Sequence, residues 1–394
     1  MSVPEITLPV PGAGSEPGVV LITTFEPSGD AHVAPVVREI RRRRPDLRIV
    51  AWGGPRLEEA GAEIIERTAD DGVMGLAGFL KAFEIKKVID RIDAWAAENP
   101  VRLHVAVDSP SANFPICERL RARGARTVHF IAPKIWAWGS WRVRRLRRNT
   151  DLVLCLLPFE ESWFGDRGVE ARFVGHPVMR KVLDPRVLEV EAESLPGGEP
   201  RILILPGSRS GEIHANLGHQ LAAFTRIRDR HPGAVALIRA TNDGIAALIR
   251  ARFPTLPDGV HLRQDRLETT IGWADLALAT SGTVSLDLAR QSCPMVGSYA
   301  IPAWQMPIAN TLVRAAFKLL PNIVLDREVV PEFVPYRNGL AARPIIEAAL
   351  PILEDDGVRD RLVAGLDEVR AAFEGFEPDT RSADAILEVF DRED

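Results

Sequence analysis

The 394-residue sequence has little cysteine and no long uncharged apolar run. Its cysteines, Cys117, Cys155 and Cys293, lie far apart, without a C-x-x-C pair or a histidine at metal-ligand spacing. This pattern argues against a disulfide scaffold or a structural zinc site and is typical of a reducing compartment. No run of about 18 uncharged apolar residues occurs, so no membrane-spanning helix is predicted.

The chain also lacks a strong charge of either sign. A net charge of -5 gives no overall attraction for nucleic acid, so any binding of anions has to be local. Residues 1–18 are rich in proline and glycine and have no basic segment followed by an apolar one. We therefore predict a flexible leader there rather than a signal peptide.

What is present is a long alternation of short apolar runs and amphipathic, helix-length stretches. This alternation is typical of a parallel sheet covered by helices on both faces. It breaks at residues 181–200, which are acidic and contain Pro-Gly-Gly, and then restarts. Strands are predicted at 19–24, 48–52, 103–107, 127–131, 152–157 and 172–174, and then at 201–205, 234–239, 260–263, 276–279 and 295–297.

The sequence thus predicts an α/β protein with two Rossmann-like, doubly wound parallel-sheet domains. They occupy residues 19–180 and 201–343, with a linker at 181–200. Residues 344–394 show no strand pattern and are predicted to be helices that pack back on either domain. Ligands of such sheets bind outside the carboxyl ends of the strands, so two facing domains form one central cleft that suits group transfer.

The first predicted strand runs into "EPSGD", residues 26–30, and then into a helical pattern. A strand, a glycine turn and a helix often bind a pyrophosphate, but here G-x-G-x-x-G is missing. Glu26 and Asp30 flank Ser28 and Gly29 and would repel phosphate. We expect this loop to meet sugar hydroxyls.

In the second half, "LPGSRSGE", residues 205–212, follows a strand and precedes a helix. The N–H groups of Gly207 and Ser208 and the guanidinium of Arg209 suit phosphate oxygens. An ordinary turn with a solvated arginine explains this loop alone about equally well.

A second loop, Ser281-Gly282-Thr283, also lies between a strand and a helix, and Asp287 follows one turn later. Small residues let a diphosphate approach the helix, and a carboxylate there suits a ribose diol. Ordinary helix capping is again the alternative. Together the two loops favour a nucleoside diphosphate site, and the missing G-x-x-x-x-G-K-[ST] argues against a P-loop NTPase.

Asp108 ends a predicted strand in "VAVDSPSANF", residues 105–114. A carboxylate at this position, facing the cleft, can take a proton from an attacking hydroxyl. The alternative is an aspartate that only caps the turn before Pro110.

Residues 136–149, "WAWGSWRVRRLRRN", combine tryptophans with arginines. Tryptophan favours the headgroup zone of a membrane and arginine pairs with lipid phosphates, so a peripheral docking surface is predicted. Its members are Trp136, Trp138, Trp141, Arg142, Arg144 and Arg145. A solvated basic helix is the alternative. Residues 73–83 are a weaker candidate for acyl-chain contact.

The chain resembles the lipid-A-disaccharide synthase family of inverting GT-B glycosyltransferases. The resembling motifs are, in family order, "EPSGD" (26–30), "GGPRLEEAGAE" (53–63), "VMGL" (73–76), "APKIWAWGSWRVRRL" (132–146), "LPFEESWF" (157–164), "FVGHPV" (173–178), "LPGSRSGEI" (205–213), "TSGTVSLD" (280–287), "CPMVGSY" (293–299) and "LPNIVLDREVVPEF" (320–333).

The resemblance implies transfer of 2,3-diacylglucosamine from its UDP derivative to 2,3-diacylglucosamine 1-phosphate, without a metal or other cofactor. It makes Asp108 the catalytic base. On the nucleotide side it implies Gly207, Ser208, Arg209, Glu212, Ser281, Gly282, Thr283, Asp287 and Asn322. On the sugar and acceptor side it implies Glu26, Ser28, Gly29, Asp30, Asn113 and His176.

The implied setting is the cytoplasm, with peripheral attachment to the inner face of the cytoplasmic membrane. The implied partners are the two acylated substrates and that membrane surface; a homodimer is a further candidate, and nucleic acid is not expected. The chain departs from the usual family pattern at Phe25, Ser111, Ala112 and Ala300. A related GT-B transferase with another sugar nucleotide or lipid acceptor, or a UDP-sugar-binding homologue without turnover, are the alternatives.

Overall fold

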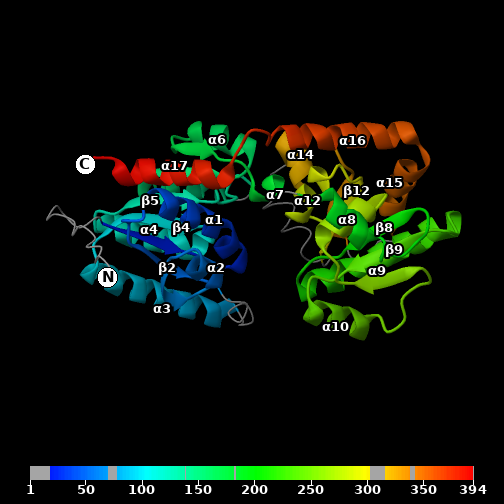
Figure 1. Ribbon diagram of the computed structural model, residues 1–394, viewed down its shortest axis with the longest axis horizontal. Helices are drawn as coiled ribbons and strands as arrows, with labels where there is room; N and C mark the ends of the chain where they lie inside the picture. The colour runs from blue at the N-terminus through cyan, green and yellow to red at the C-terminus, as the bar shows by residue number, and fades with distance from the viewer. Residues whose placement is uncertain are drawn as a thin grey trace, which may run out of the picture.

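The computed structural model describes residues 18–69, 78–137, 139–181, 183–301, 316–337 and 342–393 (Figure 1). Two parallel sheets lie side by side, each wrapped by helices, and the chain's last helix returns to the first sheet. The predicted α/β architecture with two doubly wound sheets is confirmed.

The first sheet is built around a buried strand that the amino end of the chain supplies. In sheet order it consists of β3 (Glu63–Arg67), β2 (Ile49–Gly53), β1 (Val19–Thr23), β4 (Val101–Val107), β5 (Arg126–Phe130), β6 (Leu152–Cys155) and β7 (Ala171–Phe173). All residues of β1 and β2 are buried, as expected where helices cover both faces of a sheet.

Helices cover both faces of this sheet. They are α1 (Pro27–Arg43), α2 (Pro55–Glu59), α3 (Gly78–Glu98), α4 (Pro110–Ala122), α5 (Val143–Asn149) and α6 (Pro158–Gly165). A seventh, α7 (Pro177–Arg180), follows the last strand and lies between the two domains. Five of the seven begin with a proline, a residue whose fixed φ suits the first helical position and whose missing N–H costs nothing there. The proline therefore marks where each strand-to-helix loop ends.

The second sheet repeats the plan. Its order is β10 (Val260–Arg263), β9 (Val235–Arg239), β8 (Arg201–Leu205), β11 (Leu276–Thr280), β12 (Met295–Ile301) and β13 (Glu332–Arg337). Its helices are α9 (Ser210–Arg230), α10 (Asp243–Arg252), α11 (Leu267–Trp273), α12 (Val284–Arg290) and α14 (Leu320–Leu325). The segment predicted as a linker contains α8 (Pro185–Ala192), which packs against α11.

The carboxyl-terminal helices divide between the domains (Figure 1). The helices α15 (Arg343–Glu354) and α16 (Asp356–Ala371) contribute to the core of the second domain. The last helix, α17 (Pro378–Asp391), crosses back and buries Ile386, Val389 and Phe390 in the core of the first domain against α1. Each such buried side chain contributes about 1.5–3 kcal/mol, so α17 ties the first domain to the second.

Two edge strands, β3 and β13, were not predicted from the sequence. In β3 exposed residues alternate with half-buried ones and the sequence is charged, whereas β13 contains Pro335. Proline is tolerated on edge strands because one side of the strand makes no ladder bonds. Both strands lie at an edge of their sheet, where burial is weakest and the hydrophobic signal is lowest.

Among the described residues, no helix combines the length and the apolar character needed to cross a bilayer. The predicted leader falls outside the described residues apart from Gly18, as do positions 73–77 of the acyl-contact candidate. Its last residue, Phe83, lies on α3 and is 58% exposed.

Candidate active site

Asp108 follows β4 directly and adopts an unusual backbone conformation. Its φ is 45° and that of Ser109 is 40°, so two consecutive residues with side chains occupy the left-handed region. Such conformations cost about 1–3 kcal/mol each and persist only where the surroundings impose them. The turn points to function, because it holds the half-buried Asp108 carboxylate at the carboxyl edge of the sheet.

Asn113, on α4, holds this turn through hydrogen bonds to its backbone. Its amide nitrogen donates to the carbonyl oxygens of Val107 at 2.9 Å and Asp108 at 2.8 Å, and its side-chain oxygen accepts from the Thr23 hydroxyl at 2.6 Å. Asn113 is fully buried. In this structure the amide positions Asp108, and the expected contact of Asn113 with the acceptor stays a prediction.

Asp108 opens into a cavity of about 130 Å³ that both domains line. The first domain contributes Ser28, His32, Lys134, Glu160 and His176, and the second contributes Thr283 and Leu320. The structure thus brings the predicted base together with one member of the predicted phosphate loops. It also places His176 here, as expected for a residue that lines the cleft.

Burial controls the charges in this cavity. It lowers the pKa of His176 to about 3, and it lowers the pKa of His32, where the nearby Asp108 carboxylate opposes the effect. Both imidazoles are therefore neutral at neutral pH. Burial raises the pKa of Glu160 to about 7, against hydrogen bonds from Trp136 and the backbone of Leu157 that favour the carboxylate.

The predicted phosphate loops share a larger cavity of about 470 Å³. The predicted residues that line it are Ser28, Gly207, Ser208, Arg209, Glu212, Ser281, Gly282 and Thr283. Lys134 and Arg239 also line it and add two cations that the sequence analysis did not assign. This set of donors and cations suits a diphosphate.

Glu212 already occupies part of the first phosphate loop. Its carboxylate accepts the backbone N–H of Ser208 at 2.9 Å and that of Arg209 at 3.3 Å. A side chain on Gly207, whose φ is +112°, would collide with Glu212. A phosphate can therefore bind the Ser208 N–H only after the Glu212 side chain moves away.

Two predicted nucleotide contacts are engaged elsewhere. Asp287 is buried and accepts from Lys181 at 3.0 Å, so its carboxylate is held by an ion pair rather than left free for a ribose. Asn322 is fully buried; its oxygen accepts from Val329 and Val330, and its nitrogen donates to Val330. The Asn322 amide therefore holds the loop before β13, and the nucleotide contact expected of it stays a prediction.

In the loop of residues 26–30, too, some side chains face the cavities and others are engaged in the protein. Ser28 lines both cavities, as predicted, and Glu26 precedes α1 half-buried. Asp30, however, is 1% exposed and accepts the N–H groups of Gly54 at 2.8 Å and Arg56 at 2.9 Å. Its carboxylate therefore holds the start of α2, and its expected place on the sugar side stays a prediction.

Gly29 serves packing rather than ligand contact. A side chain there would lie 2.5 Å from the Thr24 hydroxyl, so only glycine lets α1 approach the end of β1 this closely. Phe25, a departure from the family pattern, packs into the core between the sheet and α3 and α4. Ala112 is buried, Ser111 is exposed, and the backbone N–H of Ala300 donates to Asn216.

The predicted docking residues differ in exposure. Trp136 turns inward, donates its indole N–H to Glu160 at 2.9 Å and lines the interdomain space. Arg142 lies over the ring of Phe114, and Arg145 makes a paired contact with Glu118. Trp141, at 70% exposure, Arg144 and Arg145 are exposed, whereas Trp138 lies outside the described residues.

Lys134, Glu160 and Arg239 are the site residues that sequence reasoning missed. Lys134 follows β5 and Glu160 lies in the first turn of α6 after β6, inside the motifs "APKIWAWG" and "LPFEESWF", whereas Arg239 ends a predicted strand. A charged residue at a strand end or shortly after it was the available signal. Within the described ranges, no group of three or more His, Cys, Asp or Glu side chains could hold a metal ion.

Solved structures with this architecture define the class. An S. aureus protein, MnaA, solved with UDP, is similar over 96% of this chain and 99% of its own, with a TM-score of 0.65 and 10% identity. The calicheamicin glycosyltransferase CalG4 is similar over 96% and 99%, with a TM-score of 0.60 and 16% identity. The fold is that of the two-domain GT-B glycosyltransferases.

The sequence comparisons go further than the fold. The family model described as lipid-A-disaccharide synthetase matches residues 20–369. The lipid-A-disaccharide synthase of Anaeromyxobacter sp. (strain K) is 34% identical over 94% of this chain and 97% of its own, and that of Myxococcus xanthus is 30% identical over 95% and 98%. The chain belongs to the lipid-A-disaccharide synthase family and is a glycosyltransferase.

Proposed function

We propose that this enzyme condenses UDP-2,3-diacylglucosamine with 2,3-diacylglucosamine 1-phosphate in lipid A biosynthesis. The products are a β-1,6-linked disaccharide 1-phosphate and UDP. Family membership supports this reaction. One structural observation supports it most directly: Asp108 of the first domain and Thr283 of the second line the same cavity.

In the proposed mechanism, Asp108 takes the proton of the acceptor 6-hydroxyl while that oxygen attacks the anomeric carbon of the donor. The bond from the anomeric carbon to UDP breaks on the opposite face, so the configuration inverts. The neutral imidazoles of His32 and His176 line this cavity without adding a positive charge beside Asp108, and Lys134 lines it as well. Asn113 keeps the carboxylate in place through the strained turn.

The departing UDP gains negative charge, which the second cavity is equipped to stabilise. Arg209, Lys134 and Arg239 line it together with the loop from Ser281 to Thr283. Fixed cations and donors aimed at a leaving group can supply several kcal/mol of transition-state stabilisation. We therefore expect turnover without a metal ion, and unchanged activity after exhaustive treatment with EDTA tests this expectation.

Both substrates carry acyl chains, so the enzyme has to meet a membrane. Trp141 and Arg144 are exposed on neighbouring turns, which suits shallow contact with an anionic surface. We propose peripheral attachment to the cytoplasmic face of the inner membrane at this point.

The test is incubation of the purified enzyme with the acylated donor and acceptor, followed by measurement of disaccharide and UDP. Asp108→Asn should lower kcat by at least about a thousandfold while UDP binding, measured by calorimetry, stays within about twofold. Turnover only with other donors would indicate a related transferase. UDP binding by the unaltered enzyme without any product would indicate a binding protein.

A further inference from the structure

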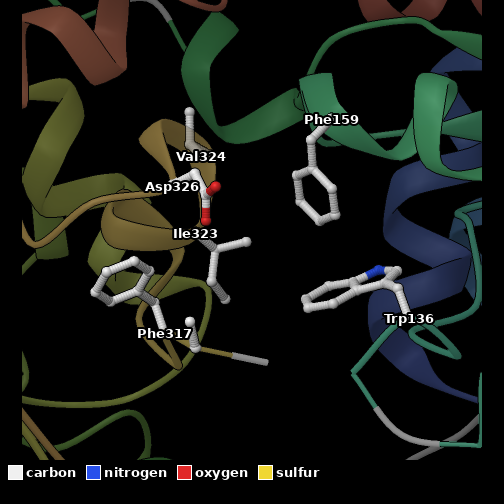
Figure 2. A pocket seen from close by; sticks show the side chains of 7 residues that line it. Trp136, Phe159, Phe317, Ile323, Val324 and Asp326 are labelled. Atoms are coloured by element: carbon white, nitrogen blue, oxygen red, sulfur yellow. The ribbon is translucent and has the colours of Figure 1, made fainter. Parts of the chain in front are cut away.

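An apolar slot lies between the two domains, beyond the polar cavities (Figure 2). Trp136 and Phe159 form one wall, and Phe317, Ile323 and Val324 form the other. Its volume is about 250 Å³. Sites for whole small molecules usually span about 300–1,000 Å³, so the slot suits one part of a larger ligand.

The first wall is held rigidly. The indole N–H of Trp136 donates to the buried Glu160 carboxyl at 2.9 Å, and its ring meets Phe159 edge to face at 5.0 Å. Because the polar edge of the indole is satisfied, the ring carbons are free to face the slot, and Figure 2 shows them extending toward the opposite wall. A fixed apolar wall binds hydrocarbon without first losing side-chain entropy.

The slot continues into the nucleotide side of the active site. It shares Trp136, Phe317 and Ile323 with an adjoining cavity of about 240 Å³. That cavity also touches Ser281 and Gly282, which line the phosphate-loop cavity as well. The adjoining cavity therefore lies between the slot and the proposed diphosphate site, and it also shares Lys134 and Leu320 with the Asp108 cavity.

We infer that the slot binds an acyl chain of the UDP-sugar donor. The inference rests on the proposed function, which supplies a donor with acyl chains. The lining is apolar apart from Asp326, whose carboxylate disfavours a phosphate or another anion at this place. Because the adjoining cavity touches Ser281 and Gly282, a chain on a donor sugar bound at the phosphate loops can enter the slot, and Asp108 itself lines neither the slot nor that cavity.

The test is a calorimetric binding series with donors whose acyl chains differ by two methylenes. Each methylene buried in the slot should contribute about fourfold in affinity. Val324→Trp fills the slot from a half-exposed position and does not alter the phosphate loops. The matched control is Val190→Trp, at a position 68% exposed on α8.

Val324→Trp should weaken binding of the long-chain donor by about tenfold or more and flatten its chain-length dependence, with UDP affinity unchanged. Val190→Trp should bind like the unaltered enzyme. The inference is overturned if Val324→Trp keeps the full chain-length dependence, or if it weakens only the acylated acceptor. Product formation is measured separately, and a missing disaccharide would refute the proposed function. The chain-length series would still show whether the slot binds an acyl chain of the donor.

Discussion

Glu160 offers a test of the electrostatics of the cleft that needs no substrate. Its side chain is 3% exposed, and its two oxygens accept the Trp136 indole N–H at 2.9 Å and the Leu157 backbone N–H at 3.0 Å. Burial nevertheless raises the pKa of Glu160 from 4.5 to about 7. We expect Glu160→Gln to remove the cost of burying this carboxylate.

The direction in which the stability changes with pH follows from proton binding by Glu160. Between pH 4.5 and pH 7 the folded protein keeps a proton on Glu160 that the unfolded chain releases. Stability therefore falls as the pH rises through this window, and the full cost is present above pH 7. A pKa difference of about 2.5, at about 1.4 kcal/mol per pKa unit, gives a cost of about 3 kcal/mol.

Other buried groups change stability in the opposite direction, so the comparison has to be between variants. Burial lowers the pKa of His104 to about 3, of His129 to about 4 and of His176 to about 3. Because of these histidines, the protein loses stability as the pH falls below 6.5, since the unfolded chain then binds protons that the folded chain does not. The unaltered enzyme and the Glu160→Gln variant have the same histidines, so this effect cancels in the difference between their free energies of unfolding.

The assay is urea unfolding from pH 5 to pH 8.5, followed in parallel by tryptophan fluorescence and circular dichroism. Relative to the unaltered enzyme, Glu160→Gln should gain about 3 kcal/mol in free energy of unfolding between pH 5 and pH 8. The exposed Glu189→Gln on α8 is the control and should show no such trend. A flat difference for Glu160→Gln across this range would refute the raised pKa and its cause.

Three further predictions concern the active site and the membrane. Asn113→Ala should lower kcat by about tenfold to a hundredfold with little change in donor KM, because the strained turn under Asp108 loses both amide hydrogen bonds; an unchanged kcat would remove its positioning role. Arg209→Ala should weaken UDP binding by about tenfold, measured by calorimetry, and acceptor binding by less, whereas equal losses would count against a phosphate contact. Trp141→Ala combined with Arg144→Glu should reduce co-sedimentation with anionic vesicles and leave neutral vesicles unaffected; unchanged sedimentation would retire the proposed docking point.

The sequence by itself determined the architecture and the positions of the loops. Alternating apolar runs and the break near residue 181 indicated two parallel sheets, and both are present. The loops around Ser28, Asp108, Gly207 and Ser281 were all placed at strand ends, where the structure has them. These features depend on local pattern, because strand and helix periods and turn chemistry involve residues close in sequence.

Tertiary structure decided which polar groups in those loops remain available to a ligand. The Asp30 carboxylate binds backbone N–H groups 24 or more residues away, and Asp287 pairs with Lys181 across 106 residues. No local pattern reveals such partners, since a carboxylate looks the same in the sequence whether it is paired or free. The inward turn of Trp136 likewise depends on Glu160 and on the opposite domain. The packing of the two domains places Asp108 at the cleft, and packing within each domain commits Asp30 and Asn322 to holding loops, because buried polar groups have to find partners in the folded chain.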